Sequence, residues 1–399
     1  MNLLLSGDYL KITWVADLIL DMSLHKTSRL QILSSLSKRG HETTLIGVRS
    51  KEQNIEKNSM GPRLFLLPLR YVPFIEPILY AASLGLLLPF YILQFKPDFV
   101  IFEPELSVVA SIPSLIMSKL TKTRFILDIR STPVESNDFN GFFRRFMFGV
   151  SVVLAKTLFS GITIITPMMR KEVSKKYGVV LNKMGVWTTG VDLKLFNPVK
   201  HISEGVELRR KLGLSNSFVV FYHGHLSPGR GLVEAVEAFR ILKKTQLGMV
   251  LFLIGSGSST EILKSLVRRA DLQGQVIIHG PVEYERVPDF ISIADVCIVP
   301  LPDHPDWRSQ CSLKLLEYFS MEKVVIATDI PAHTVVAGDS PCCLYVSSSE
   351  PEVLAEMMLL ARSKRDKLGS WGKSGRVIVR RNYTWHKVAL DLENYLYSL

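Results

Sequence analysis

Seven residues, Ser312–Tyr318, combine side chains that could bind a phosphorylated ligand. Serine commonly caps the first turn of a helix, whose free backbone N–H groups and positive dipole end can hold a phosphate. Glu317 lies about one and a half turns further along the same helix, where its carboxylate could accept two hydroxyls of a ribose. The stretch therefore predicts an anion site at Ser312 and Leu313, with Lys314 beside it and a ribose contact at Glu317.

A glycine-rich loop earlier in the chain is a second candidate phosphate site. Within Val219–Val236 an apolar strand runs into glycines at positions 224, 229 and 231, then into an amphipathic helix, and Arg230 supplies a cation. Glycine lets the backbone approach a ligand closely, and a guanidinium can fork onto a diphosphate. Taken alone, the loop favours an ordinary strand-to-helix turn over a phosphate site.

Several motifs follow one another in an order that resembles a known family. The loop Gly224–Gly231 is followed by Leu253–Gly257, Ala294-Asp295, Lys314–Glu317 and Ile326–Thr328. This series resembles the nucleotide-sugar site of the family 4 (group 1) retaining glycosyltransferases, and the resemblance extends over nearly the full chain. It implies an α/β protein of the GT-B fold, with two doubly wound Rossmann-like domains facing a central cleft.

The resemblance also implies roles for individual residues. It implies a nucleotide-diphosphate-sugar donor bound at Gly224, His225, Arg230, Gly255, Val282, Ser309, Ser312, Leu313, Lys314 and Glu317. Arg230 and Glu317 count among the catalytic residues as well. Two positions depart from the family pattern: Ser309 replaces the first of a glutamate pair, and His225 replaces an arginine. Arg230 then becomes the principal cation for the diphosphate.

The first half of the chain is expected to supply the acceptor side. Asp128 ends the expected strand Arg124–Asp128 and Arg130 follows it; the resemblance implies that both are catalytic and that Arg130 faces the acceptor. A turn cap and a surface salt bridge are the alternative interpretation. Asp17 and His25, in the loop after the expected strand Lys11–Ala16, are further acceptor-side candidates. That loop lacks the family's glycines, and a solvated helix start explains His25 equally well.

Length and composition set limits on the classes of partner. The chain has 399 residues, 47% of them hydrophobic, which is enough for two folded domains. Its formal net charge of +11 suits nucleotide diphosphates or acidic lipid head groups. Nucleic acid is not expected, because no zinc-finger spacing or RNA-binding aromatic signature occurs. No metal-ligand spacing occurs either, so we expect no metal cofactor. The four cysteines lack Cys-x-x-Cys spacing and no signal peptide is evident, which favours a cytoplasmic protein.

Two segments of the first half have features of membrane contact. Pro73–Phe95 is the most apolar part of the chain, but Pro89 interrupts it, which favours a buried or interface-lying helix over a membrane span. Residues 139–148 alternate aromatic side chains with Arg144 and Arg145, as a helix on an anionic membrane surface would. An amphipathic helix that packs its aromatics inside fits these residues equally well.

The order of strands and helices predicts two domains. Residues 1–199 form the acceptor-side domain, with a C-terminal helix at 380–399 packing back on it, and 200–379 form the nucleotide-sugar domain. In the second domain, strands near 218–223, 249–254, 275–279, 295–300, 323–328 and 343–346 alternate with helices, which predicts a parallel sheet. In the first domain, Ser107–Leu120 is expected to be one helix.

These observations predict a retaining hexosyltransferase that moves a sugar from a nucleotide-diphosphate donor to a glycan or lipid-linked acceptor. Its expected role is cell-surface polysaccharide or glycolipid biosynthesis, in the cytoplasm or peripherally at the inner face of the membrane. The alternative is a catalytically silent glycosyltransferase-like binding subunit, which Ser309, His225 and the glycine-free loop favour. A sugar-nucleotide epimerase of similar fold is disfavoured, because the motif order is that of the transferases.

Overall fold

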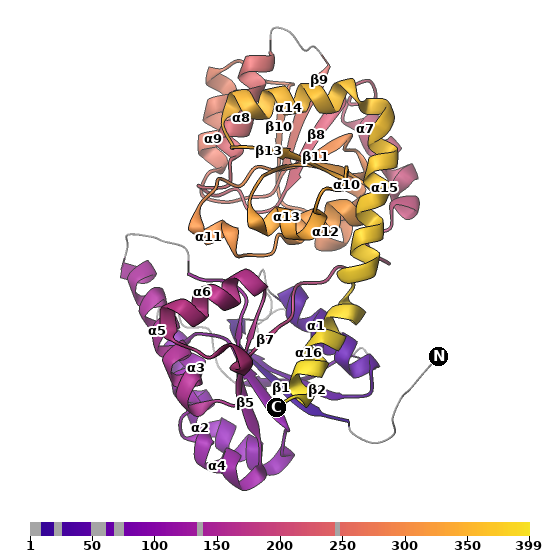
Figure 1. Ribbon diagram of the computed structural model, residues 1–399. Helices are drawn as coiled ribbons and strands as arrows, with labels where there is room; N and C mark the ends of the chain where they lie inside the picture. The colour runs from indigo at the N-terminus through magenta and orange to yellow at the C-terminus, as the bar shows by residue number, and fades with distance from the viewer. Residues whose placement is uncertain (1–8, 20–25, 49–60, 68–75, 134–138, 244–247) are drawn as a thin grey trace. The chain divides into compact units, whose positions relative to one another are not determined.

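The computed structural model divides the chain into two compact units (Figure 1). Unit 1 comprises Met1–Thr189 and Trp385–Leu399, and unit 2 comprises Gly190–Thr384. The described residues are 9–19, 26–48, 61–67, 76–133, 139–243 and 248–399. The sequence placed the boundary at 199, but Val191 and Phe196 are buried in the core of unit 2. Val191 also forms a β-bridge with Thr384.

Unit 1 contains a seven-stranded parallel sheet with the order β3-β2-β1-β4-β5-β6-β7. The order reverses between β1 and β4, and ligands of doubly wound sheets bind beyond the carboxyl ends of the strands at such a point. The strands are β1 (Lys11–Ile19), β2 (Glu42–Val48), β3 (Arg63–Leu67), β4 (Phe99–Phe102), β5 (Arg124–Ile129), β6 (Gly161–Ile164) and β7 (Met184–Val186).

Helices cover both faces of this sheet. Successive side chains of a strand point to opposite faces, and Trp14 of β1 packs on the side of α1 (Lys26–Lys38) and α16 (Trp385–Tyr397). Thr13 points the other way and hydrogen-bonds Tyr91 of α2 (Glu76–Phe95). The remaining helical segments of unit 1 are α3 (Leu106–Ala110), α4 (Ser114–Thr121), α5 (Phe139–Leu158), α6 (Pro167–Tyr177) and η1 (Leu181–Lys183).

Two expectations for unit 1 were wrong. The helix expected at Ser107–Leu120 is split into α3 and α4, because Pro113 lacks the N–H group that would continue α3. The first strand extends to Ile19, which pairs with Val48 across an irregularity in register. Asp17 therefore lies within β1 and not in the loop that follows it.

Unit 2 contains a six-stranded parallel sheet with the order β10-β9-β8-β11-β12-β13, which reverses between β8 and β11. The prediction of two doubly wound parallel α/β domains is therefore confirmed. The strands are β8 (Phe218–His223), β9 (Met249–Ile254), β10 (Val276–His279), β11 (Val296–Val299), β12 (Val324–Thr328) and β13 (Cys343–Val346).

Helices bury both faces of the second sheet. All six residues of β8 are buried, with Val219 and Phe221 in the core on one face and Val220 and Tyr222 in the core on the other. The helical segments are η2 (Pro198–His201), α7 (Ile202–Lys211), α8 (Leu232–Leu242), α9 (Thr260–Arg269), η3 (Tyr284–Arg286), α10 (Val287–Ser292), α11 (Pro305–Arg308), α12 (Leu313–Ser320), α13 (Pro331–Ala337), α14 (Pro351–Ser363) and α15 (Arg365–Asn382).

Candidate functional site

The two elements proposed to bind phosphate lie side by side in unit 2. A Cβ atom placed on Gly224, at the end of β8, would lie 3.2 Å from the Lys314 Nζ on α12. The same ammonium lies 5.4 Å from the ring centroid of Tyr222. The loop after β8 and the start of α12 therefore share one local site, although 90 residues of sequence separate Gly224 and Lys314 (314 minus 224).

Glycine is required where this loop meets its neighbours. Gly255 has φ +141°, and a Cβ atom there would lie 1.9 Å from the carbonyl oxygen of Gly224. Gly231 has φ +70°, and a Cβ atom there would lie 1.8 Å from the carbonyl oxygen of Pro300. Both positions combine a left-handed backbone with a contact too close for any side chain. The carboxyl ends of β8, β9 and β11 are therefore packed backbone against backbone around the candidate site.

Two cations converge at this loop. Arg230 is half-buried, donates from Nε to Ser227 Oγ at 3.0 Å, and holds its guanidinium 5.1 Å from the Trp307 ring centroid. Burial lowers the pKa of Lys314 to about 8, and repulsion from Arg230 acts in the same direction. An anion bound here would relieve that repulsion. His225, by contrast, is exposed, and its carbonyl oxygen accepts a hydrogen bond from Tyr222.

The carboxylate of Glu317 is buried and already hydrogen-bonded. His223 Nε2 lies 2.9 Å from Oε2, and the Tyr284 hydroxyl donates to Oε1 at 3.0 Å. The Tyr318 hydroxyl accepts from the backbone N–H of His223 and lies 3.0 Å from Nδ1 of the same ring. If Tyr318 donates to Nδ1, a neutral His223 has Nε2–H available to donate to Glu317. Each carboxylate oxygen then retains a lone pair for a ligand hydroxyl.

The start of α12 differs in one respect from the prediction. Ser312 is the N-cap residue, with φ −82° and ψ 102°, but its side chain makes no capping hydrogen bond. Leu313 is the first helical residue and is half-buried, whereas Ser309, three residues before Ser312, is almost fully buried. Val282 is half-buried against the unit 2 core.

In unit 1, Asp128 is fully buried near the carboxyl end of β5. Its Oδ1 accepts hydrogen bonds from Thr163 Oγ1 at 2.6 Å and from Trp187 Nε1 at 2.9 Å. Burial raises the pKa of Asp128 to about 6, and the charge of Arg130 partly opposes that shift. The carboxyl is therefore held near the pH range in which it could exchange a proton.

Arg130 is bound to Trp187 in two ways. Its guanidinium lies 3.7 Å from the Trp187 ring centroid, and Nη1 donates to the Trp187 carbonyl oxygen at 2.8 Å. Its Nε lies 4.0 Å from Asp128 Oδ2. The surface salt bridge weighed as an alternative is wrong, because Asp128 is fully buried and the Arg130 side chain is 14% exposed. The structure brings the Asp128 and Arg130 side chains together; their acceptor-side role stays a prediction.

A second buried carboxylate lies at the end of β4. Glu103 accepts a hydrogen bond from Trp14 Nε1 at 3.2 Å and pairs with Arg29 of α1. Of the two remaining acceptor-side candidates, Asp17 is described only as a backbone position in β1, and His25 lies outside the described residues.

Comparison with known proteins agrees with this geometry. Residues 206–377 match the family model described as Glycosyl transferases group 1. The matched residues all lie in the second unit. A D-inositol 3-phosphate glycosyltransferase of Xylanimonas cellulosilytica is 29% identical over 227 residues, which are 55% of this chain and 52% of that protein. An uncharacterized glycosyltransferase of Methanocaldococcus jannaschii is 24% identical over 195 residues, 47% of this chain and 46% of that protein. The matches thus span about half the length of these curated relatives.

The fold agrees over nearly the whole chain with those of solved proteins, one of them a glycosyltransferase of Rickettsia africae. HepE of Anabaena, crystallised with UDP and glucose, superposes with a TM-score of 0.76 at 14% identity, covering 98% of this chain and all of that one. At this identity the likeness shows the fold alone, which is GT-B.

Several residues of the candidate glycosyltransferase site were missed by the sequence reasoning. They are His223, Tyr284, Tyr318 and Trp307 in unit 2, and Thr163 and Trp187 in unit 1. His223 could have been found, because it ends a buried strand immediately before Gly224. Tyr318 adjoins Glu317 in the stretch Ser312–Tyr318, but its sequence position does not reveal its contact with His223. The remaining residues are distant in sequence from the side chains that they contact, and nothing in their local pattern marks them.

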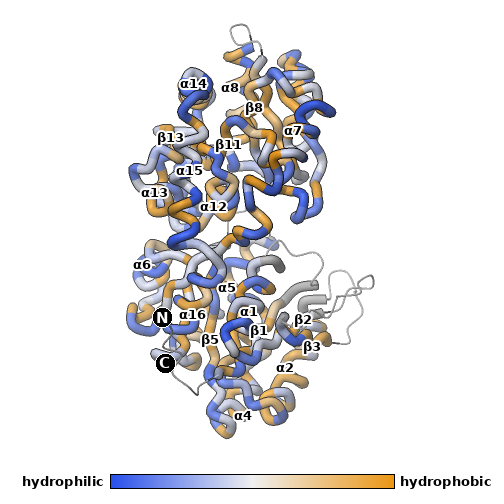
Figure 2. Tube along the Cα trace, turned by 90° about the vertical axis from the view of Figure 1, so that its right-hand side faces the viewer, coloured by the Kyte–Doolittle hydropathy of each residue, from blue (hydrophilic) through white to orange (hydrophobic). Residues whose placement is uncertain are grey.

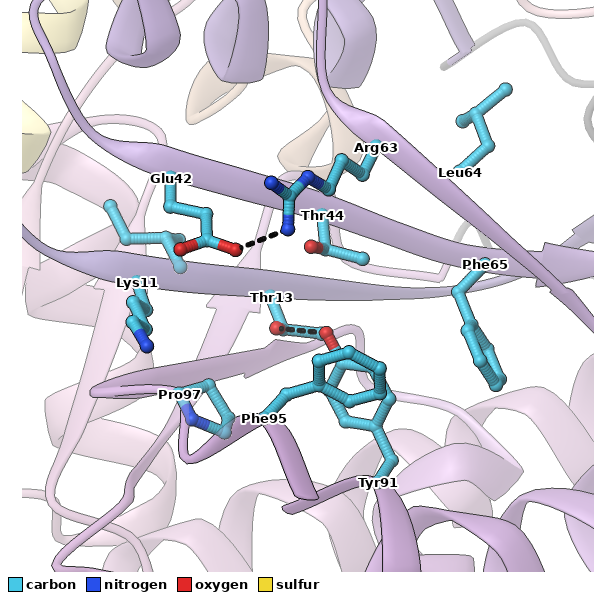
Figure 3. A pocket seen from close by; sticks show the side chains of 11 residues that line it. Lys11, Thr13, Glu42, Thr44, Arg63, Leu64, Phe65, Tyr91, Phe95 and Pro97 are labelled. Carbon is cyan, nitrogen blue, oxygen red and sulfur yellow. Dashed lines mark hydrogen bonds and ion pairs between the residues drawn. The ribbon is translucent and has the colours of Figure 1, made fainter. Parts of the chain in front are cut away.

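A pocket of about 150 Å³ lies elsewhere in unit 1 (Figure 3). It lies at the amino ends of β1, β2 and β3, beside the end of α2, and is lined by the Arg63–Glu42 ion pair and the Thr13–Tyr91 hydrogen bond. Asp128 lies toward the opposite, carboxyl edge of the same sheet, so this pocket is separate from the candidate site. Among the described residues, no group of three His, Cys, Asp or Glu side chains could hold a metal ion.

Proposed function

We propose that this glycosyltransferase transfers a sugar, with retention, from a nucleotide-diphosphate-sugar donor to a hydroxyl of a glycan or lipid-linked acceptor. The observation that carries the proposal is the convergence of Arg230, Lys314 and the start of α12 beside Gly224. Two cations and a helix start at the carboxyl end of a parallel sheet suit a diphosphate. The match of this unit to group 1 glycosyl transferases supports the same ligand.

In this proposal the protein stabilises the negative charge of the departing nucleotide. Arg230 forks onto the diphosphate, and the anion in turn favours the charged form of Lys314. Glu317, held by His223 and Tyr284, accepts the ribose hydroxyls through its remaining lone pairs. Val282 offers its backbone to the base, and Gly255 keeps the floor of the site free of side chains. We assign no metal to the reaction.

The acceptor side is proposed to use the Asp128–Arg130 pair. With a pKa near 6, the buried Asp128 carboxyl would be largely ionised at neutral pH and could hold a hydroxyl of the acceptor. Arg130 is fixed by its stacking on Trp187 and can donate to an acceptor oxygen. We place the reaction in cell-surface polysaccharide or glycolipid biosynthesis, in a cytoplasmic protein associated peripherally with the inner face of the membrane.

A catalytically silent binding subunit is the second candidate. Two observations favour it: the exposed His225 lies outside the two hydrogen-bonded networks described above, and Ser309 supplies no carboxylate to the donor sugar. Such a subunit would retain nucleotide binding through Arg230 and Lys314 and show no turnover.

The two candidates are separated by measuring nucleotide release. The purified protein is incubated with UDP-, GDP-, ADP- and dTDP-sugars, with water or a membrane-lipid extract as acceptor. We expect one donor to be turned over, with the anomeric configuration kept in the product by proton NMR, and Arg230→Ala to lower the rate at least about a hundredfold. Arg240→Ala is the matched control, since Arg240 is exposed and pairs with Glu237 on α8. Nucleotide binding without nucleotide release would establish the silent subunit. If the protein neither binds nor releases a nucleotide, both candidate functions are refuted.

A further inference from the structure

Helix α2 of unit 1 is apolar on both faces. Its inner face carries Tyr80, Leu84, Leu88, Tyr91 and Ile92, all buried at helical spacing. Two hydrogen bonds fix this face to β1, from the Tyr80 hydroxyl to the Ala16 carbonyl oxygen at 2.7 Å and between Tyr91 and Thr13 at 3.0 Å. This face therefore belongs to the core.

The outer face of α2 is equally apolar but uncovered. Its large side chains are exposed, with Leu86 and Phe90 each 70% exposed; the others are Ile78, Leu79, Leu87, Leu93 and Phe95. The window Ile78–Phe95 is long and apolar enough to cross a membrane, yet only 28% of it is buried in the protein. A helix on the surface of a soluble protein normally turns polar residues outward. Figure 2 shows α2 in hydrophobic colours along much of its length.

Neighbouring helices continue this surface. α2 packs against α3 and α4, and α3 packs against α5. Exposed apolar side chains on these neighbours include Ile116 and Leu120 of α4 and Phe142, Phe143 and Phe146 of α5. We call the exposed apolar residues of α2, α4 and α5 the apolar helix face. Exposed apolar side chains that gather on neighbouring helices often mark an interaction site.

The exposed charges of the segment that carries the apolar helix face are mainly positive. Among the described residues of 78–158, the exposed cations are Lys96, Lys119, Lys122, Arg124, Arg144 and Lys156, and the exposed acids are Asp98 and Glu105. Lys119 lies next to Leu120, so its long side chain can reach outward beside an apolar contact. A second copy of this chain would bring like charges together. An anionic lipid bilayer complements both the apolar side chains and the cations.

We propose that the apolar helix face docks unit 1 onto an anionic lipid bilayer, with α2 lying in the plane of the interface and not crossing it. Spanning would pull the buried inner face of α2, with its Tyr80 and Tyr91 hydrogen bonds, out of the core of unit 1. In the docked arrangement that face stays in the protein while Leu86 and Phe90 enter the lipid. This inference does not depend on turnover of any sugar donor.

Vesicle sedimentation of the full-length protein tests the docking surface. We expect the wild-type protein to sediment with phosphatidylcholine vesicles that contain about 30% phosphatidylglycerol, and much less with phosphatidylcholine alone. The double variant Leu86→Ser/Phe90→Ser should bind the anionic vesicles at least about tenfold more weakly. Ile262→Ser/Val335→Ser, at positions 54% and 61% exposed in unit 2, is the matched control and should bind as the wild type does.

Insertion can be read at a single position. The fluorescence of the added tryptophan is obtained by subtracting the wild-type spectrum. For Phe90→Trp its emission should shift to shorter wavelength when anionic vesicles are added, and for Ile262→Trp it should not. Equal melting temperatures would show that the serine variants are folded. The proposal is overturned if the wild-type protein stays in the supernatant or if Leu86→Ser/Phe90→Ser binds vesicles as well as the wild type. If the wild-type protein is a dimer in solution and Leu86→Ser/Phe90→Ser is a monomer, the apolar helix face binds a second copy of the chain and the membrane proposal is overturned.

Discussion

At the scale of single residues, His223 governs how the Glu317 carboxylate is presented to a ligand. The imidazole lies between the Tyr318 hydroxyl and Glu317 Oε2, with both contacts within hydrogen-bond distance. The Tyr284 hydroxyl donates to Glu317 Oε1, and the centroid of its ring lies 5.7 Å from that of Phe196. The carboxylate is thus fixed by donors from β8 and η3 before any nucleotide arrives, which lowers the entropic cost of binding a ribose.

Replacing His223 should therefore weaken nucleotide binding, although His223 acts through Glu317 and not by touching the nucleotide. His223→Leu removes the donor to Oε2, and we expect about a tenfold rise in the calorimetric Kd for the cognate nucleoside diphosphate. His223→Gln retains an N–H donor and should stay within about threefold of the wild type. If both variants lose affinity equally, the ring serves packing alone and the assignment of His223 as a positioning residue is wrong.

Asp128 should make the stability of unit 1 depend on pH. Its pKa is raised from 3.8 to about 6 in the folded protein, so the folded state binds the proton more tightly than the unfolded state. The free energy of unfolding therefore falls as pH rises from about 4 to about 6, and the change is complete above that range. Asp128→Asn removes this titration while keeping an acceptor for Thr163 and Trp187.

We expect the difference in unfolding free energy between Asp128→Asn and the wild type to shift by up to about 3 kcal/mol between pH 4 and pH 7, in favour of the variant at pH 7. Denaturant titrations at both pH values measure it. A difference that stays constant with pH would show that the Asp128 pKa is ordinary in the folded protein.

The sequence singled out the residues that converge at the candidate site of unit 2, but not the side chains that hold Asp128 in unit 1. Arg230, Lys314 and Gly224 could be placed because each belongs to a local pattern, a glycine loop or a helix start. The partners of Asp128 could not, since Thr163 and Trp187 reach it only through the order of β5, β6 and β7 in the sheet. Nothing in the local sequence of a buried polar contact reports which strand will lie beside it.

At the scale of elements, the starts of α12 and α6 look alike in sequence and differ in structure. Ser312 at the N-cap of α12 makes no side-chain capping bond, whereas the Thr166 Oγ1 accepts from the Met169 backbone N–H at 3.1 Å. Ser312→Ala should therefore change the free energy of unfolding by less than about 0.5 kcal/mol, and Thr166→Ala should lower it by about 1 kcal/mol. Thermal unfolding of both variants measures the contrast; a loss of stability in Ser312→Ala as large as in Thr166→Ala would contradict it.

Prolines limited the prediction of elements in unit 1. Pro113 ends one helix and separates α3 from α4, which the apolar run did not indicate. Pro89, by contrast, lies inside the continuous helix α2. The cost of an interior proline is about 3 kcal/mol. Burial of Leu84, Leu88 and Ile92 on both sides of Pro89 offsets it. The strands of unit 2 were easier to predict, because their buried apolar runs are uninterrupted.

At the scale of the whole molecule, the last helix completes unit 1. α16 contributes Trp385, Val388, Ala389, Leu392 and Leu396 to the core of that unit. Its Glu393 pairs with His41 at 2.6 Å, and its Tyr395 hydroxyl donates to the Lys183 carbonyl oxygen at 2.7 Å. Unit 1 is thus built from two ends of the chain, with unit 2 inserted between them.

Deleting residues 385–399 should destabilise unit 1 and leave unit 2 folded. Four large buried apolar side chains leave the core with α16, at about 1.5–3 kcal/mol each, and their sum is comparable with the stability of an ordinary domain. Hydrogen exchange should show protection lost across β1–β7 and kept across β8–β13. Loss of protection in both units together would contradict the division into two independent cores.

The most direct test of the account is calorimetric titration of the full-length protein with UDP, GDP, ADP and dTDP. The geometry of Arg230, Lys314 and Glu317 predicts micromolar binding of one of them, weakened at least about tenfold by Arg230→Ala and by Glu317→Ala. Arg240→Ala, on the same unit but paired with Glu237, should bind as the wild type does. Absence of binding by all four nucleotides, or equal binding by Arg230→Ala, would contradict the assignment of this site to a nucleotide-sugar donor.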